Sequence, residues 1–115
     1  MAKYEKALTG DFSEFLEQLH RDITQGSVSA SYEDGSDIRL GEAVRLAVRV
    51  YERYSMMGGN RVSLNVTVLG HGRDLFVSAI TSGGSQAMFV KFNTLGESAF
   101  LEKCIQSVER YLARR

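Results

Sequence analysis

Apolar residues recur along the chain with two periods, which separate helices from strands. One set lies three or four positions apart, the spacing of a single helix face, and consists of Phe12, Phe15, Leu16, Leu19 and Ile23. Asp11, just before this set, can accept hydrogen bonds from first-turn amides. Gly26, just after it, is expected to end the helix in a left-handed conformation. The spacing predicts a helix between Asp11 and Gly26.

A second helix is predicted near the end of the chain. Thr94 and Glu97 match the capping-box pattern, and helical spacing continues to about Leu112. The apolar stripe of this helix consists of Phe100, Leu101, Cys104, Ile105, Val108, Tyr111 and Leu112. Cys104 on that stripe is expected to be a buried core thiol.

Elsewhere apolar and polar residues alternate one by one, which is typical of strands. The predicted strands are residues 3–8, 27–32, 43–54, 61–69, 75–82 and 86–92. The segment 33–37 (Glu-Asp-Gly-Ser-Asp) has the composition of a turn. Since each helix has one apolar stripe, we expect both to cover one face of an antiparallel sheet and leave the other open. This predicts a single α+β domain over residues 1–115, in the order β-α-β(4–5)-α.

This order of elements resembles the TATA-binding-protein-like and helix-grip folds. In those folds a long C-terminal helix lies across a curved sheet. The resemblance implies architecture alone, because a fold does not license a function.

Hairpin register predicts which side chains share the open face. A two-residue turn at 71–72 would pair Val68 with Leu75, and a second at 83–84 would keep the inward side chains apolar. We therefore expect the even-numbered residues of 44–68 beneath the helices. The open face would then present Arg45, Arg49, Tyr51, Arg53, Phe76, Ile80 and Phe89.

Three functions are open at this stage, and two of them use the open face. Rings and arginines are enriched in interfaces, and two-fold dimers are the commonest soluble assembly, which favours a homodimer. A small ligand between the C-terminal helix and the sheet is the alternative. Single-stranded nucleic acid could stack on the rings, but a net charge of zero lacks the basic excess of nucleic-acid binders, and we do not expect it.

The zero net charge hides an uneven distribution along the chain. Residues 1–37 hold eight acids and three bases, whereas residues 38–73 hold six arginines and two acids. The arginines either pair with acids of the same fold or contact a partner. The Gly/Ser segment Ser82, Gly83, Gly84 and Ser85 is expected to be a hairpin tip whose amides could hold an anion.

Composition and motifs exclude several classes of protein. At 115 residues the chain can bury one core, and a lone cysteine excludes a disulfide scaffold. No apolar run approaches the roughly 20 residues of a membrane span, and the charged start is unlike a signal peptide, so we expect a cytoplasmic protein. There is no Ser-His-Asp arrangement, Walker loop, Rossmann glycine pattern or metal-ligand spacing. We therefore expect no cofactor and no metal, and we favour a protein that is not an enzyme.

Two stretches carry a resemblance to a known family. They are Tyr-Glu-Arg-Tyr-Ser-Met-Met-Gly-Gly-Asn-Arg-Val-Ser-Leu-Asn (51–65) and Ser-Ala-Ile-Thr-Ser-Gly-Gly-Ser-Gln-Ala (78–87). They resemble a family of small bacterial proteins of unknown function. The resemblance implies a bacterial cytosolic protein and supplies no activity, cofactor or catalytic residue. The sequence thus predicts a binding module that self-associates through its open sheet face.

Overall fold

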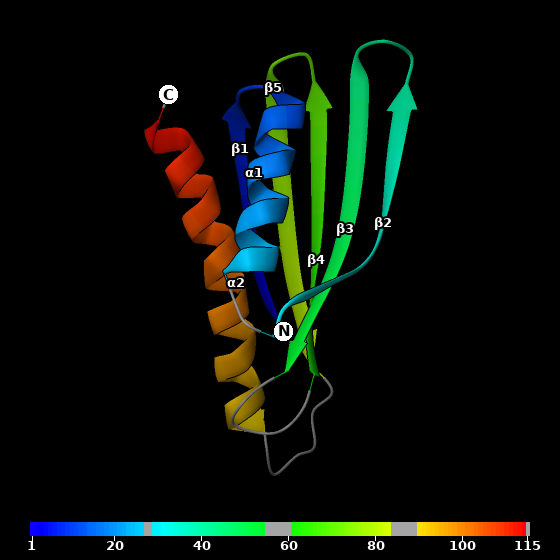
Figure 1. Ribbon diagram of the computed structural model, residues 1–115. Coiled ribbons are helices and arrows are strands. Elements are labelled where there is room, and N and C mark those ends of the chain that lie inside the picture. Colours follow the sequence, from blue (N-terminus) through cyan, green and yellow to red (C-terminus); the bar gives the residue numbers. More distant parts are fainter. Residues whose placement is uncertain (27–28, 55–60, 84–89, 115) are drawn as a thin grey trace.

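The arrangement of helices and strands follows the computed structural model of the chain, shown in Figure 1. It describes residues 1–26, 29–54, 61–83 and 90–114, with the backbone alone for residues 90–97. Along the chain the elements are β1 (Ala2–Thr9), α1 (Phe12–Gln25), β2 (Ser31–Leu40), β3 (Val44–Tyr54), β4 (Arg61–His71), β5 (Asp74–Gly83) and α2 (Val90–Ala113).

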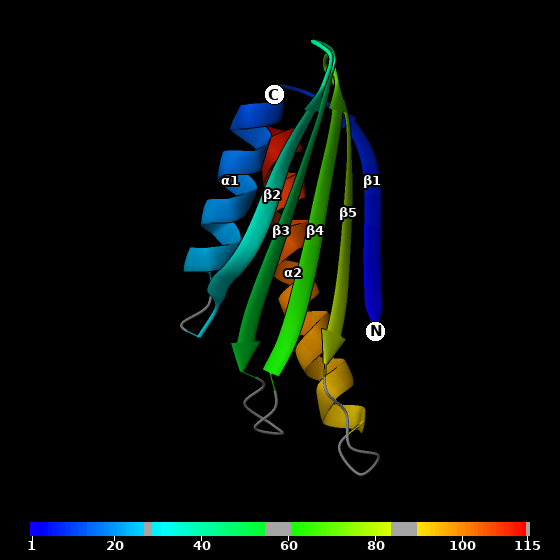
Figure 2. The ribbon, with the colours of Figure 1, turned by 90° about the vertical axis from the view of Figure 1, so that its right-hand side faces the viewer.

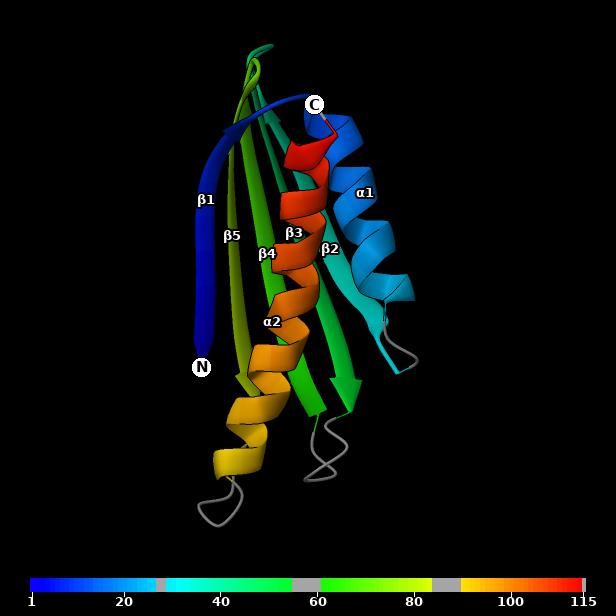
Figure 3. The same cartoon turned by 90° about the vertical axis from the view of Figure 1, so that its left-hand side faces the viewer.

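The strands form one antiparallel sheet in the order β1-β5-β4-β3-β2. Both helices lie on the same side of it: the strands stand in front of α2 in Figure 2, and the helices stand in front of the sheet in Figure 3. The predicted α+β class and its helix-covered sheet are confirmed.

Helix α1 begins and ends close to the predicted positions. The Asp11 side chain accepts a hydrogen bond from the Glu14 amide at 2.8 Å, which satisfies a first-turn donor. Gly26 has a φ of −81°, so the predicted left-handed ending is wrong. Instead the Gly26 amide continues the helical pattern and donates to the Asp22 carbonyl at 2.9 Å.

Strand β2 runs through the segment that composition assigned to a turn. Residues 33–37 lie inside β2, and its register with β3 shifts between Tyr32 and Asp34, which is a β-bulge at Glu33. The chain turns at residues 41–43, where Gly41 has a φ of +61°. The predicted turn is wrong because an edge strand tolerates turn-forming residues once a bulge takes up the extra residue.

The hairpin of β4 and β5 confirms the predicted sides and corrects the predicted partners. His71 pairs with Asp74, so the turn is Gly72-Arg73, and Val68 faces Val77 instead of Leu75. Gly72 has a φ of +61° at the first central position, which a type II′ turn requires. The register differs by two residues, and because side chains alternate with a period of two, every inward residue stays inward.

The predicted strand 86–92 is wrong over its described residues 90–92, and the capping box at Thr94 is wrong as well. Val90–Phe92 are helical, and Thr94 and Glu97 lie inside α2. The second predicted hairpin is therefore wrong at residues 90–92, and residues 84–89 lie outside the described residues. A short apolar run cannot be assigned to strand or helix from periodicity alone.

The core lies between the sheet and the two predicted helix stripes. Phe15, Leu19 and Ile23 of α1 are buried, as are Phe100 and Cys104 of α2. Phe15 meets Tyr111 of α2 edge to face at a centroid distance of 5.0 Å. Both helical stripes and the core position of the thiol are thus confirmed.

Candidate functional site

The residues predicted to share the open face lie on opposite sides of the sheet. In β3, Tyr51 is buried opposite Leu64, and Ala47 is buried opposite Val68. Since directly paired residues point to the same side of a sheet, the odd-numbered residues of β3 face the helices. The predicted placement of Arg45, Arg49, Tyr51 and Arg53 on the open face is therefore wrong.

Two of these arginines pack against aromatic rings of the helices. The Arg45 guanidinium carbon lies 4.4 Å from the Phe12 ring centroid, and that of Arg53 lies 5.1 Å from the Phe100 ring centroid. Burial lowers the pKa of Arg53. Long arginine stems can cover apolar surface while the charged end reaches outward, so arginine on a helix-covered strand is physically acceptable.

The reversal of β3 makes the open face more apolar than the sequence predicted. We define the open face patch as the apolar side chains on the uncovered side of β2 to β5: Ile38, Leu40, Val44, Leu46, Val48, Val50, Leu69, Phe76 and Ile80. Phe76 and Ile80 were predicted here, and each keeps 39% of its surface exposed. Phe89 lies outside the described residues.

One row of the patch crosses the whole sheet. Successive strand pairings place Ile38 beside Leu46, Leu46 beside Leu69, Leu69 beside Phe76, and Phe76 beside Ala7. The next row on this face, two residues along each strand, is largely polar and ends at Glu5. The Glu5 carboxylate accepts a hydrogen bond from the Ser78 hydroxyl at 2.8 Å. An uninterrupted apolar row of this kind is unlike an ordinary solvated sheet face.

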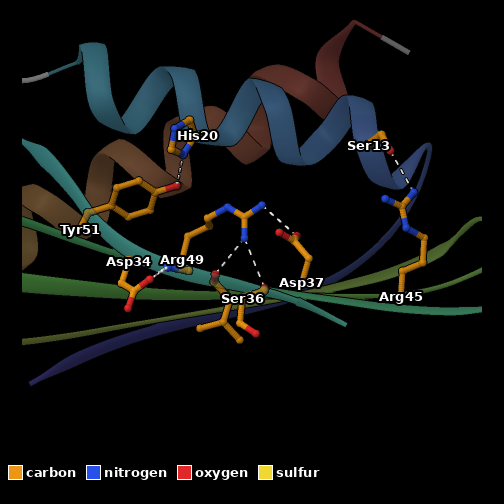
Figure 4. Close-up of polar contacts among 10 residues, drawn as sticks. Ser13, His20, Asp34, Ser36, Asp37, Arg45, Arg49 and Tyr51 are labelled. Carbon is orange, nitrogen blue, oxygen red and sulfur yellow. Dashed lines mark hydrogen bonds and ion pairs between the residues drawn. The ribbon is translucent and has the colours of Figure 1, made fainter. Parts of the chain in front are cut away.

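A cleft lies on the other side of the sheet, between α1 and the strands β2 and β3. Its volume is about 810 Å³, and its walls include Ser13 and His20 of α1, Tyr32 of β2 and Arg45 and Arg49 of β3. Figure 4 shows Ser13, His20, Arg45 and Arg49 in the space between α1 and the strands. The helix-grip alternative placed a pocket under α2, so this cleft lies elsewhere.

Three rings gather at one end of the cleft. The imidazole of His20 meets the ring of Tyr32 edge to face at 5.0 Å and lies 5.5 Å from that of Tyr51. His20 Nδ1 is hydrogen-bonded to the Tyr51 hydroxyl at 2.8 Å. Burial and then the nearby charge of Arg49 lower the pKa of His20, so the neutral ring is favoured. Burial raises the pKa of Tyr51, which keeps its hydroxyl protonated.

The two cleft arginines differ in how their charge is compensated. Arg49 donates to the carbonyls of Val48 and Ser36 at 2.9 and 3.3 Å and forms an ion pair with Asp37 at 2.9 Å. Arg45 donates to the Ser13 hydroxyl at 2.9 Å. Among the described residues, no carboxylate lies within 4.0 Å of Arg45. Arg45 therefore presents a positive charge that is held in place without a counter-charge.

The described part of the predicted anion loop belongs to strand β5. Ser82 and Gly83 are the last residues of β5 and pair with Ser63 and Val62. The hydroxyls of Ser82 and Ser63 are hydrogen-bonded at 2.8 Å. Gly84 and Ser85 lie outside the described residues, so the proposed loop stays a prediction.

The sequence alone did not bring His20, Tyr32 and Asp37 together in one cleft. Tyr32 ends the predicted strand 27–32 and does lie in β2, whereas Asp37 fell in the segment predicted to be a turn. No local signal links His20 to Tyr51, because 31 residues separate them and only the fold brings them together.

Further findings concern membrane spans, metal sites and related proteins. No helix in the described residues combines the length and the apolar character of a membrane span. Among the same residues, no group of three potential ligand side chains could hold a metal ion. No curated protein matches the chain at a significant level. A family profile described as a family of unknown function, DUF6054, matches residues 1–112, and the chain therefore belongs to that family.

Proposed function

We propose that the protein is a non-enzymatic binding module that self-associates, two copies packing sheet against sheet through the open face patch. The observation that carries this proposal is the apolar row from Ile38 to Ala7, which runs across all five strands. Large exposed apolar patches on soluble chains mark interaction sites.

The size of the open face fits a stable dimer. Neighbouring strands lie about 4.8 Å apart and a residue advances about 3.3 Å, so five strands of about ten residues span roughly 24 by 33 Å, or about 800 Å². A standard protein interface buries about 800 Å² on each partner. One face of this sheet is therefore large enough, without contributions from loops.

The chemistry of the face favours a second copy of the same chain as its occupant. The row is uncharged, and the charges of the open side lie toward the margins, as with Lys3 and Glu5 of the edge strand β1. A two-fold axis in the plane of contact and along the row places each apolar side chain against the row of the other copy. Sheets packed in this way lie about 10 Å apart with interdigitated side chains.

Self-association is tested by the mass of the protein in solution. At micromolar concentration we expect light scattering and sedimentation to give twice the chain mass of 12.8 kDa. The variant Leu69→Arg places two like charges in the contact and is expected to be monomeric. The control Gln106→Arg adds the same charge on an exposed position of α2 and should leave the dimer intact.

Two results would overturn the proposal. The first is a wild-type chain that stays monomeric at micromolar concentration, which would leave the face for a different occupant. The second is a Leu69→Arg variant that remains dimeric, which would place the contact elsewhere.

A further inference from the structure

The cleft between α1 and the strands β2 and β3 has the dimensions and chemistry of a ligand site. Ligand pockets typically enclose about 300–1,000 Å³ and combine apolar or aromatic walls with a few fixed polar groups. The cleft, with a volume of about 810 Å³, has rings at one end and a guanidinium at the other. It lies on the helix side of the sheet, away from the open face patch.

At the aromatic end, a flat group can contact two rings. Tyr32 keeps 46% of its surface exposed, while Tyr51 behind it is buried and holds the imidazole of His20 through a hydrogen bond. The second imidazole nitrogen, Nε2, has no partner within the described part of the chain. The neutral imidazole can therefore offer one hydrogen-bonding atom to a ligand.

At the other end, Arg45 is prepared for an anion. Its stacking on Phe12 and its bond to the Ser13 hydroxyl fix the guanidinium plane. That bond uses one of the five N–H donors of an arginine. Glu17 and Asp37 also line the cleft, but no described carboxylate lies within 4.0 Å of Arg45. A planar guanidinium fixed in this way can bind a carboxylate or phosphate through two parallel hydrogen bonds.

Between these ends, Arg49 lines the cleft and connects β3 to β2. Its side chain is 15% exposed and is engaged by Asp37 and by two backbone carbonyls. These contacts use three of its five N–H donors, and Asp37 neutralises its charge. Arg49 therefore holds β2 to β3, and Arg45 is the better anion contact. Gly35 leaves room for this packing, since a Cβ there would approach Tyr32 and the Val48 carbonyl.

The distance between the two ends sets the shape of the ligand. Arg45 and Tyr51 are six residues apart on β3, which corresponds to roughly 20 Å between their backbones. The contacting side chains lie closer together, because Arg45 reaches across to Ser13 of α1, and Ser13 and His20 are seven residues apart on that helix, roughly 10 Å along its axis. A compact ion such as free phosphate cannot contact both ends.

We infer that this cleft binds an elongated organic anion, with a ring or other flat group against His20 and Tyr32 and a carboxylate or phosphate on Arg45. The inference does not depend on the proposed dimer, because the cleft and the open face patch lie on opposite sides of the sheet.

The inference is tested by titrating the ¹⁵N-labelled protein with 6-phenylhexanoate, its uncharged amide and inorganic phosphate, followed by NMR. The acid is expected to shift amide signals of α1, β2 and β3 in a saturable way, and the amide is expected to bind at least about tenfold more weakly. Inorganic phosphate should give no saturable shift at Tyr32.

Variants separate the two ends of the cleft. Arg45→Gln should weaken binding of the acid at least about tenfold, and Arg45→Lys, which keeps the charge but loses the planar fork, should weaken it less. Tyr32→Thr should weaken the acid and the amide together. The control Arg73→Gln removes one charge from the exposed β4–β5 turn and should change nothing. A native NMR spectrum and melting temperature establish that each variant is folded.

The inference is overturned if the acid gives no saturable shifts on α1, β2 and β3. It is also overturned if acid and amide bind equally well, or if folded Arg45→Gln binds as the wild type does. Shifts confined to the open face patch, with none on α1, would mean that the hydrophobic acid adsorbs there and would likewise overturn the inference. Repeating the titration on the monomeric Leu69→Arg variant distinguishes failure of the cleft from failure of the dimer.

Discussion

Replacing Phe76 by threonine tests the proposed dimer contact quantitatively. Phe76 lies in the apolar row between Leu69 and Ala7, and 39% of its surface is exposed. For an aromatic side chain of roughly 200 Å², this is about 80 Å² that a partner can cover. At about 25 cal/mol per Å², covering it contributes about 2 kcal/mol per copy.

A two-fold contact contains Phe76 twice, so the substitution removes about 4 kcal/mol in total. The dissociation constant should then rise by two to three orders of magnitude, since 1.4 kcal/mol corresponds to a factor of ten. Threonine retains good strand propensity, so the monomer should stay folded.

Sedimentation equilibrium over a range of concentrations measures this change directly. The matched control is Tyr32→Thr, which removes a ring of similar exposure, 46%, on the opposite side of the sheet. Its dissociation constant should equal that of the wild type. A Phe76→Thr dimer whose constant lies within a few fold of the wild-type value would refute the reasoning, as would an equal loss in both variants.

Four further expectations concern the folded chain itself. Tyr51→Phe removes the hydroxyl bonded to His20 and should lower the free energy of unfolding by about 1 kcal/mol in a urea titration; an unchanged midpoint would contradict the role of that bond. Because burial lowers the pKa of His20, the unfolded chain binds its proton more readily. This contribution to the free energy of unfolding is complete above about pH 6.5 and is lost as the pH falls through the lower pKa of the folded state. In a plot of unfolding free energy against pH, His20→Gln should remove this contribution. Coincident plots for wild type and variant would argue against it. Gly35→Ala should lower the free energy of unfolding by about 1–3 kcal/mol, since the added Cβ would lie 2.7 Å from the Val48 carbonyl oxygen. Thermal melting measures this loss, and an unchanged melting temperature would mean that the bulge adjusts freely. Burial raises the pKa of Cys104 to about 12, so a thiol reagent at pH 8 should react only after urea unfolds the chain; rapid reaction of the native protein would show that the thiol is accessible.

Helical and strand periodicity were sufficient for the class of the fold. Phe15 and Leu19, like Cys104, were assigned to the core because their spacing matches one helix face, and they are buried. In β4 and β5 the sides were correct despite a register error of two residues, since an even shift leaves each side chain on its own face.

Strand β3 shows why part of the open face was not predictable. Both of its sides carry apolar residues, with Val48 on one and Tyr51 on the other. The side of β3 that faces the helices depends on its register with β4, in which Tyr54 pairs with Arg61. The intervening residues 55–60 allow either parity from sequence alone, and one residue of slip exchanges the two faces.

The cleft could not be predicted for a related reason. Its side chains come from three elements, and the contacts Arg45–Ser13 and His20–Tyr51 each join residues more than 30 positions apart. The composition of residues 33–37 also led to a wrong prediction. Their carboxylates suggested a local turn, whereas Asp37 forms an ion pair with Arg49 on the neighbouring strand.

The two outer strands limit how far assembly of this sheet can proceed. The β2 edge carries the bulge at Glu33 and charged Asp34 and Asp37, and the β1 edge carries Lys3 and Lys6. Bulges and charges at a border hinder the docking of another chain's backbone. Growth by strand addition, the route to fibrils, is therefore opposed at both borders. If two copies pair as proposed, one partner covers the open face patch, and the borders of the sheet then oppose further growth.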